Sequence, residues 1–177
     1  MKKLLLLLIT SLAFSTVTDI DGNVYETVII GDQLWMAENL KVTHYRNGDE
    51  IPTGYSNDDW SNLFTGAYAV YDDDPSNAEI YGNLYSWYAI DLETGVCPEG
   101  WHVPTDDEYI LLTDYLGGND IAGGKMKEAG LEHWDSPNTG ATNESGFSGL
   151  PGGFRNVTGS YVYMGSDGYF RSSSEYS

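Results

Sequence analysis

The chain has 177 residues and carries 27 Asp and Glu against eight Lys and Arg, a formal net charge of −19 at pH 7. So acidic a chain repels the phosphates of nucleic acids and of anionic lipids, and neither is expected as a partner. The length suits one ordinary domain, and the single Cys excludes an internal disulfide framework.

The first 15 residues have the pattern of a secretory signal peptide. Two Lys precede an apolar run, and Ala13 and Ser15 are the small side chains that a signal peptidase accepts before a cleavage site. The run is shorter than the roughly 20 apolar residues that a membrane-spanning helix needs. We therefore expect cleavage before Thr16, a single domain over residues 16–177, and a secreted or cell-surface location without membrane insertion. The mature domain has six Lys and Arg against 27 acidic residues, a net charge of −21.

The mature domain is predicted to begin with a β-hairpin. Val24–Ile30 forms the first strand, Gly31-Asp32 the turn and Gln33–Met36 the return strand. Apolar residues alternate onto both faces of the first strand, so we expect both faces to be covered. Residues 41–78 are rich in turn residues and in aromatic rings, which predicts a long but ordered loop region.

The second half is predicted to mix helices, loops and a closing hairpin. Residues 81–90 favour a helix from Asn83 onward. Thr105 and Glu108 form a capping box that starts a helix over Asp106–Leu116. Its apolar stripe is Tyr109, Leu112 and Leu116, widened by Ile110 and Leu111. A helical turn is expected over residues 125–129, and Asp167-Gly168 predicts that strand 161–164 pairs with strand 169–173.

Short Trp- and Gly-containing blocks recur along the whole chain. The clearest runs from Cys97 to Thr105, CPEGWHVPT, and others are WMAENL at 35–40, YGNLYSW at 81–87, ATNESGF at 141–147 and LPGGFR at 150–155. In this order they resemble the Fibrobacter succinogenes major paralogous domain, and the resemblance covers residues 19–177.

The resemblance implies an exported bacterial domain of α+β class with a C-type lectin-like fold. That fold has two helices, small antiparallel sheets and long irregular loops that present the binding surface. Members of the family run on through a final strand that carries a second Cys. The resemblance therefore implies that this chain lacks its C-terminal strand and that Cys97 is a free thiol. It implies no particular activity.

An acidic loop is the one candidate metal site. Asp72, Asp73 and Asp74, with Asn77 and Glu79, offer the hard oxygen ligands that calcium prefers. Their spacing is not that of an EF-hand, and a solvated acidic loop is the competing interpretation. No Cys or His cluster has the spacing of a zinc site. The sequence thus predicts that no cofactor is required, with calcium kept as an alternative.

Catalysis finds little support, because the three His residues are scattered and none stands at a motif spacing from a nucleophile. His102, between Trp101 and Val103, is expected to be a core histidine. A binding protein is therefore predicted rather than an enzyme. An enzyme acting on extracellular glycans is the least favoured alternative.

Fourteen Tyr and five Trp against five Phe supply rings with a polar edge, which suits sugar- and protein-binding surfaces. Trp35, Trp87 and Trp101 are assigned to the core. The candidates for ligand contact are those that loops could expose: Trp60, Tyr71, Trp134, Tyr161 and Tyr163. The predicted function is recognition of a polysaccharide or a cell-surface protein. The alternative is a structural display domain whose acidic face provides hydration.

Overall fold

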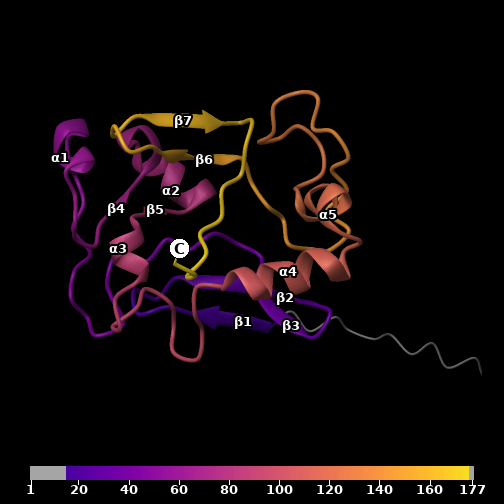
Figure 1. Ribbon diagram of the computed structural model, residues 1–177, viewed down its shortest axis with the longest axis horizontal. Helices are drawn as coiled ribbons and strands as arrows, with labels where there is room; N and C mark the ends of the chain where they lie inside the picture. The colour runs from indigo at the N-terminus through magenta and orange to yellow at the C-terminus, as the bar shows by residue number, and fades with distance from the viewer. Residues whose placement is uncertain (1–14, 176–177) are drawn as a thin grey trace, which may run out of the picture.

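A small antiparallel sheet forms one side of the molecule. The computed structural model describes residues 15–175 (Figure 1), so the predicted signal peptide, apart from its last residue, lies outside the described residues. The sheet has the order β1 (Ser15–Thr18), β2 (Val24–Ile30) and β3 (Gln33–Met36). The predicted hairpin is confirmed at both strands, and β1 is an additional edge strand.

Both faces of β2 carry buried residues, as predicted, although the odd-numbered face is open to solvent at the end of the strand. Tyr25 and Ile30 are buried, whereas the side chain of Ile29 is 73% exposed. Ile30 packs against helix α4 (Asp106–Tyr115), and Ile29 points to the opposite face because side chains alternate along a strand. On the face of Ile29 the earlier residues Tyr25 and Thr27 are buried, so the exposure is confined to the last turn-proximal position of that face.

Helix α4 begins where the sequence predicts. The hydroxyl of Thr105 accepts from the amide of Glu108 at 3.3 Å, and the Glu108 carboxylate accepts from the Thr105 amide at 2.8 Å. This capping box satisfies two amides that the first helical turn leaves without partners. The helix ends at Leu116 as its C-cap residue.

The apolar stripe of α4 is narrower than predicted. Leu112 and Leu116 are buried against the sheet, but Ile110 and Leu111 are 54% and 60% exposed. The two exposed residues lie about 200° and 100° around the helix from Leu112, and only the stripe itself meets the sheet.

Helix α5 (Asn119–Met126) follows α4 and packs on it through Ala122. The predicted turn over residues 125–129 is wrong, since the helix begins earlier and includes Gly123 and Gly124. A Cβ on Gly124 would collide with the carbonyl oxygen of Gly140, so a loop passes directly over this helix. Glycine here permits close packing rather than ending the helix.

Short elements occupy the region predicted as an ordered loop, residues 41–78, and the segment that follows it to residue 90. They are α1 (Asn57–Ser61), β4 (Tyr68–Ala69), the 3₁₀ helix η1 (Tyr71–Asp73), α2 (Pro75–Tyr81), β5 (Leu84–Tyr85) and α3 (Trp87–Ile90). The helix predicted from Asn83 onward is wrong in its first turn, because Leu84 and Tyr85 pair with β4. Helical structure starts at Trp87.

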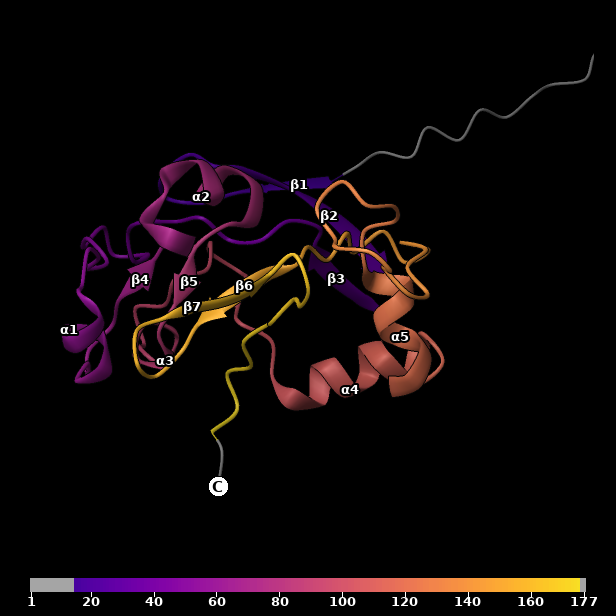
Figure 2. The same cartoon turned by 90° about the horizontal axis from the view of Figure 1, so that it is seen from above.

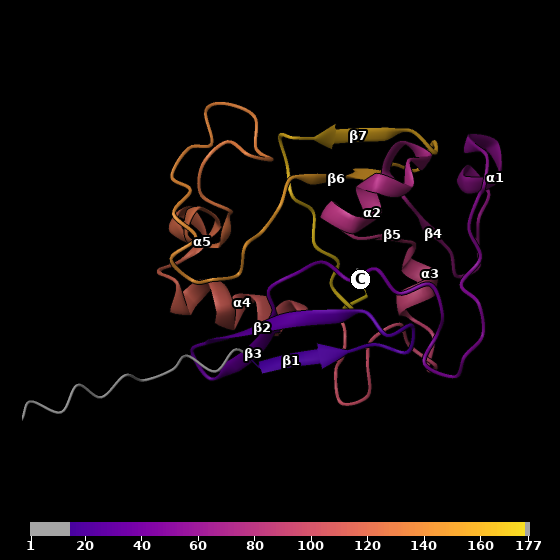
Figure 3. The same ribbon diagram turned by 180° about the vertical axis from the view of Figure 1, so that it is seen from behind.

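The closing hairpin uses a different pair of strands from the predicted one. Strand β7 (Tyr161–Met164) pairs with β6 (Gly152–Arg155), and residues 169–173 form no strand. The turn between β6 and β7 is built on Asn156, whose side-chain oxygen accepts from the amides of Thr158 and Ser160. After β7 the chain crosses to the start of α4, where Ser173 donates to the carbonyl of Pro104 (Figure 3).

The described residues thus form an α+β structure with five α-helices, where the resemblance implied two, and small antiparallel sheets. Seen from above, the β1–β3 sheet with α4 and α5 lies beside the β6–β7 hairpin and α2 (Figure 2). Residues from both parts line a cleft of about 1760 Å³. Within residues 15–175, no helix has the length and apolar character of a membrane span.

Candidate functional site

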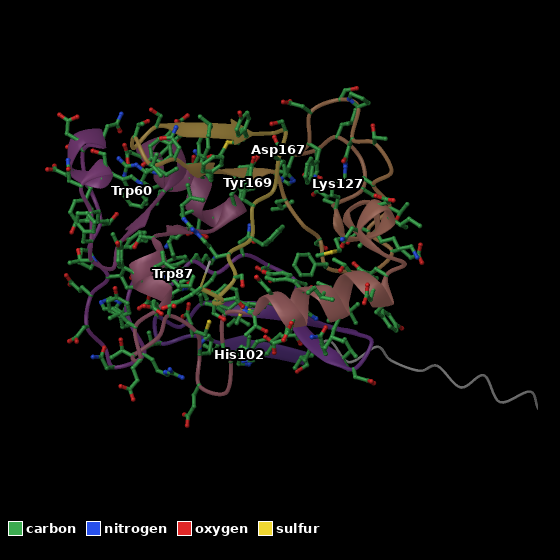
Figure 4. The ribbon with its side chains drawn as sticks, in the orientation of Figure 1. Trp60, Trp87, His102, Lys127, Asp167 and Tyr169 are labelled. Atoms are coloured by element: carbon green, nitrogen blue, oxygen red, sulfur yellow. The ribbon has the colours of Figure 1, made fainter. Side chains whose placement is uncertain are left out.

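The β6–β7 hairpin carries two aromatic clusters. We call Trp60, Tyr71, Arg155 and Tyr161 the closed stack, and Phe154, Tyr163 and Tyr169 the open platform. Figure 4 marks Trp60 of α1 and Tyr169 on the chain that leaves β7. Four of the five predicted ligand residues lie in one cluster or the other.

The closed stack is organised around a buried guanidinium. The Cζ atom of Arg155 lies 4.4 Å from the ring centroid of Trp60 and 4.9 Å from that of Tyr161. The Tyr71 ring lies 5.2 Å from Tyr161, and Arg155 is only 6% exposed. The rings of Trp60 and Tyr161 therefore engage the guanidinium through cation–π contacts.

Neutral acceptors complete the binding of Arg155. Its Nε donates to the carbonyl of Gly159 at 2.9 Å, and its Nη2 donates to the carbonyl of Tyr55 at 2.7 Å and to Asn57 Oδ1 at 3.3 Å. These bonds attach the α1 loop to the hairpin. Much of the ring surface of the predicted ligand residues Trp60, Tyr71 and Tyr161 is thus in contact with other residues of the protein.

The acidic loop is divided among separate structural contacts. Asp73 accepts from the Tyr161 hydroxyl at 2.6 Å; burial first, and this hydrogen bond second, raise the Tyr161 pKa. Asp74 caps α2 by accepting from the Ser76 amide at 3.0 Å, which lowers the Asp74 pKa.

The other predicted calcium ligands point to other partners. The amide of Asn77 donates to the Tyr71 carbonyl at 2.9 Å, and Glu79 pairs with Lys41 at 2.9 Å. No three His, Cys, Asp or Glu side chains within residues 15–175 are placed to hold a metal ion. Calcium binding stays a prediction, and the described residues contain no preformed carboxylate cluster that supports it.

Trp134 stands apart from both clusters. It is 8% exposed, its Nε1 donates to the Gly149 carbonyl at 3.1 Å, and Lys127 Nζ lies 4.8 Å from its ring centroid. This ring is part of the packing beneath the loop after α5. Its surface is therefore not free for a ligand.

The open platform exposes its rings. The Phe154 centroid lies 4.5 Å from that of Tyr169 and 6.0 Å from that of Tyr163, and the two Tyr rings lie 6.4 Å apart with planes only 30° apart. Tyr163 is 56% exposed and Tyr169 is 53% exposed. Tyr163 is the one predicted ligand residue whose ring is mostly open to solvent.

Backbone strain places Tyr163 on the platform. Its φ is +67°, a left-handed conformation that is a real outlier for a bulky residue. In a regular ladder Tyr163 would share the face of Tyr161 and Arg155, opposite to Phe154. The distortion instead turns its ring toward Phe154, as a bulge re-aims a side chain.

Neighbouring groups hold this distortion in place. Gly153, opposite Tyr163, also has a positive φ of 59°, and a Cβ there would collide with the carbonyl of Val162. The Tyr163 carbonyl accepts from the amides of Ser166 at 3.2 Å and Asp167 at 3.1 Å. The Gly152-Gly153 pair therefore allows both strands to bend at one point.

The platform borders the cleft. Phe154 and Tyr169 line it together with Tyr81 of α2 and Tyr109 of α4. A volume of about 1760 Å³ exceeds the roughly 300–1,000 Å³ of small-molecule pockets. The dimensions suit a segment of a polymer better than a single small molecule.

Several core assignments need correction. Trp35 is buried as predicted, but Trp87 and Trp101 are only half-buried. His102 is not a core residue: its side chain is 67% exposed and hydrogen bonds to Glu108 at 2.8 Å. The loop that carries it ends at the cap of α4 and follows the surface.

Cys97 is a free thiol in the described structure, as the resemblance implies. Burial raises its pKa to about 11, so the unreactive thiol form dominates at neutral pH.

Residues 28–177 match the Fibrobacter succinogenes major domain. The chain belongs to this family. No curated protein and no solved structure shows significant similarity to it. The Fibrobacter succinogenes major domain thus accounts for the Trp- and Gly-containing blocks but brings no activity with it.

Sequence reasoning missed two platform residues of this Fibrobacter succinogenes major domain, Phe154 and Tyr169. Both follow glycines, in Gly152-Gly153-Phe154 and Gly168-Tyr169. Adjacent glycines inside a strand signal a bulge, and this was the one available clue. The contact between the two rings depends on the path of the chain after β7. The predicted path, in which residues 169–173 pair with β7, is wrong.

Proposed function

We propose that this protein is an exported recognition module that binds polysaccharide through the open platform. The proposal rests on one observation: Tyr163 is held in a strained conformation that exposes its ring beside Phe154 and Tyr169. A left-handed conformation costs about 1–3 kcal/mol. An exposed ring recovers little of this cost by burial, so a role in binding explains why the conformation is kept.

Polysaccharide fits the shape and chemistry of the platform. The C–H faces of a sugar ring are flat and apolar, and they stack on exposed aromatic faces while the hydroxyls remain at the edges. The near-parallel rings of Tyr163 and Tyr169 offer two such faces, each with a hydroxyl that can donate or accept. The adjoining cleft extends the surface beyond one sugar unit.

The fold and location proposed here are those that the family resemblance implies. We propose a C-type lectin-like arrangement, supported by the N-terminal hairpin, the α4 and α5 helices and the long loop-rich segments. Export to the cell surface or medium is supported by the N-terminal sequence. No catalytic group takes part in the proposed function.

Affinity electrophoresis and calorimetry with soluble neutral polysaccharides test the proposal on the secreted chain. Laminarin, hydroxyethylcellulose and galactomannan form a first panel. We expect at least one to bind, and Tyr169→Ala to weaken that binding about tenfold, as for a truncated aromatic hot spot.

Phe64→Ala is the matched control. Phe64 is 76% exposed and its ring pairs with Tyr88 at 6.2 Å, in a loop outside the platform. Removing this ring, which is more exposed than that of Tyr169, should leave affinity unchanged. Loss of binding in both variants, or in neither, contradicts a site on the platform. A protein that binds no glycan supports the display alternative instead.

A further inference from the structure

The turn after β7 places carboxylates at the edge of the open platform. Asp167 lies two residues before Tyr169. Desolvation is the larger cause that raises the Tyr169 pKa, and the negative charge of Asp167 is the second. Asp135 reaches the same turn: its amide donates to the Gly165 carbonyl at 2.8 Å, and a Cβ on Gly165 would lie 2.8 Å from Asp135 Oδ2. Figure 4 marks Asp167 beside Tyr169.

The other end of β7 is also acidic. Asp73 is bonded to the Tyr161 hydroxyl, and Asp72 is close enough to contribute to the raised Tyr161 pKa. Neither Asp135 nor Asp167 forms an ion pair with a residue in the described part of the chain. The carboxylates around the platform therefore keep their negative charge uncompensated.

Most cations of the domain are occupied elsewhere. Lys41 and Lys125 pair with glutamates, Lys127 is held by the Thr139 carbonyl and the Trp134 ring, and Arg155 is buried in the closed stack. Arg171, two residues after Tyr169, lines the cleft and is the cation near the platform that is not part of the closed stack. This one guanidinium stands against the net charge of −21 that the mature domain carries.

From this arrangement we propose that the open platform selects neutral glycan chains and rejects glycans that carry carboxylate or sulfate groups. The inference rests on the proposed function and adds the class of ligand. Carboxylates act only as acceptors, so Asp135 and Asp167 accept hydrogen bonds from sugar hydroxyls. An anionic substituent at the same edge supplies no donor and meets repulsion instead.

Matched polymers test the selection. The neutral polysaccharide that binds best in the panel is compared with the same material after partial carboxymethylation, so that the backbone is unchanged and only charge is added. At about 10 mM salt we expect carboxymethylation to weaken binding at least tenfold, and at about 300 mM salt we expect the difference to shrink, because salt screens exposed charges.

The variant Asp135→Asn/Asp167→Asn isolates the cause. It should bind the carboxymethylated polymer at least threefold more tightly than wild type does at low salt, while its affinity for the neutral polymer falls, because an amide oxygen accepts more weakly than a carboxylate. Asp120→Asn, an exposed carboxylate in α5, is the control and should change neither affinity. Arg171→Gln should lower the residual affinity for the carboxymethylated polymer.

The outcomes separate this inference from the proposed function. Equal affinity for the two polymers, with both dependent on Tyr169, overturns the selection and leaves platform binding intact. Preferential binding of alginate or another acidic glycan also overturns the selection alone. If no glycan of either class binds, both proposals fall.

Discussion

The closed stack and the open platform lie on the same hairpin, yet they use aromatic rings in opposite ways. In the closed stack, the rings of Trp60 and Tyr161 enclose a guanidinium that is 6% exposed and bonded to three oxygens. In the open platform, Tyr163 is 56% exposed and its backbone is strained. The closed stack stabilises the fold, whereas the strained backbone of the open platform lowers the stability of the folded state.

This contrast separates two kinds of aromatic residue that composition cannot distinguish. Rings that enclose a buried charge connect chain segments distant in sequence, here residues 55–60 and 155–161. Rings that are exposed by a distorted backbone contribute little to folding. Residues of the second kind are the better candidates for binding, because their position needs another explanation.

Removing the guanidinium should break the closed stack and have the largest effect. Arg155→Met leaves the carbonyls of Gly159 and Tyr55 without their donor, and we expect it to lower the free energy of unfolding by about 3 kcal/mol. Urea titration at pH 7 measures the change. The control is Arg46→Met, because Arg46 donates to loop carbonyls at 3.2 and 3.4 Å from an exposed position and should lose less than 1 kcal/mol. Similar losses in the two variants would show that burial of Arg155 is not the source of its contribution.

Relieving the strain should change the open platform in the opposite direction. Tyr163→Gly removes a conformational cost of about 1–3 kcal/mol and gives up ring contacts worth about 0.5–1.5 kcal/mol. We expect a net gain in stability of about 1 kcal/mol together with loss of polysaccharide binding. Thermal unfolding and affinity electrophoresis of one sample measure both.

The variant Tyr163→Ala controls for the ring alone, because alanine keeps the left-handed strain. It should lose binding and gain no stability. If Tyr163→Gly is less stable than wild type, the ring contributes to packing and the contrast between the two clusters fails.

A smaller effect is expected at the edge of the closed stack. Tyr161→Phe keeps the ring beside Arg155 but removes the hydroxyl that donates to Asp73 at 2.6 Å. Because this bond is exposed, we expect a loss of only about 0.5 kcal/mol by urea titration. The variant Tyr161→Leu removes the ring as well and should cost more than Tyr161→Phe. Equal losses in the two variants would mean that the cation–π contact makes no measurable contribution to the free energy of unfolding.

Local signals in the sequence predicted the elements that depend on neighbouring residues. The β2–β3 hairpin follows from alternation and a Gly-Asp turn, and α4 follows from the capping box of Thr105 and Glu108. These patterns act within a few residues, so tertiary contacts need not be known. The family resemblance reached further, since its blocks span the chain.

The misses share a physical cause. Pairing of β6 with β7, rather than of β7 with residues 169–173, depends on the chain crossing to α4, where Ser173 bonds to Pro104. The aromatic candidates were named without knowing which would meet Arg155, a residue about 100 positions away from Tyr55. Burial and strain arise from such long-range contacts, and composition does not encode them locally.

Acid should act on the cap of α4 and on the turn between β1 and β2 and should spare the closed stack, so a change of pH tests the contrast further. The hydrogen bond from Thr105 lowers the pKa of Glu108 against the opposing effect of desolvation. At Asp21, burial opposes the shift but hydrogen bonds from Thr43 lower the pKa overall. Because both pKa values are depressed in the folded state, the stability they supply is present above the unfolded values of about 4 and is lost as pH falls through the folded values.

The acceptors of Arg155 are two carbonyls and an amide, none of which titrates in this range. Hydrogen exchange between pH 5 and pH 3, corrected for intrinsic rates, should therefore show the first turn of α4 losing protection while the β6–β7 hairpin keeps it. In Glu108→Gln the side chain no longer titrates, and protection of that turn should become independent of pH. Simultaneous loss in α4 and the hairpin would mean that the two halves unfold as one unit, and the closed stack would then have no separate stability.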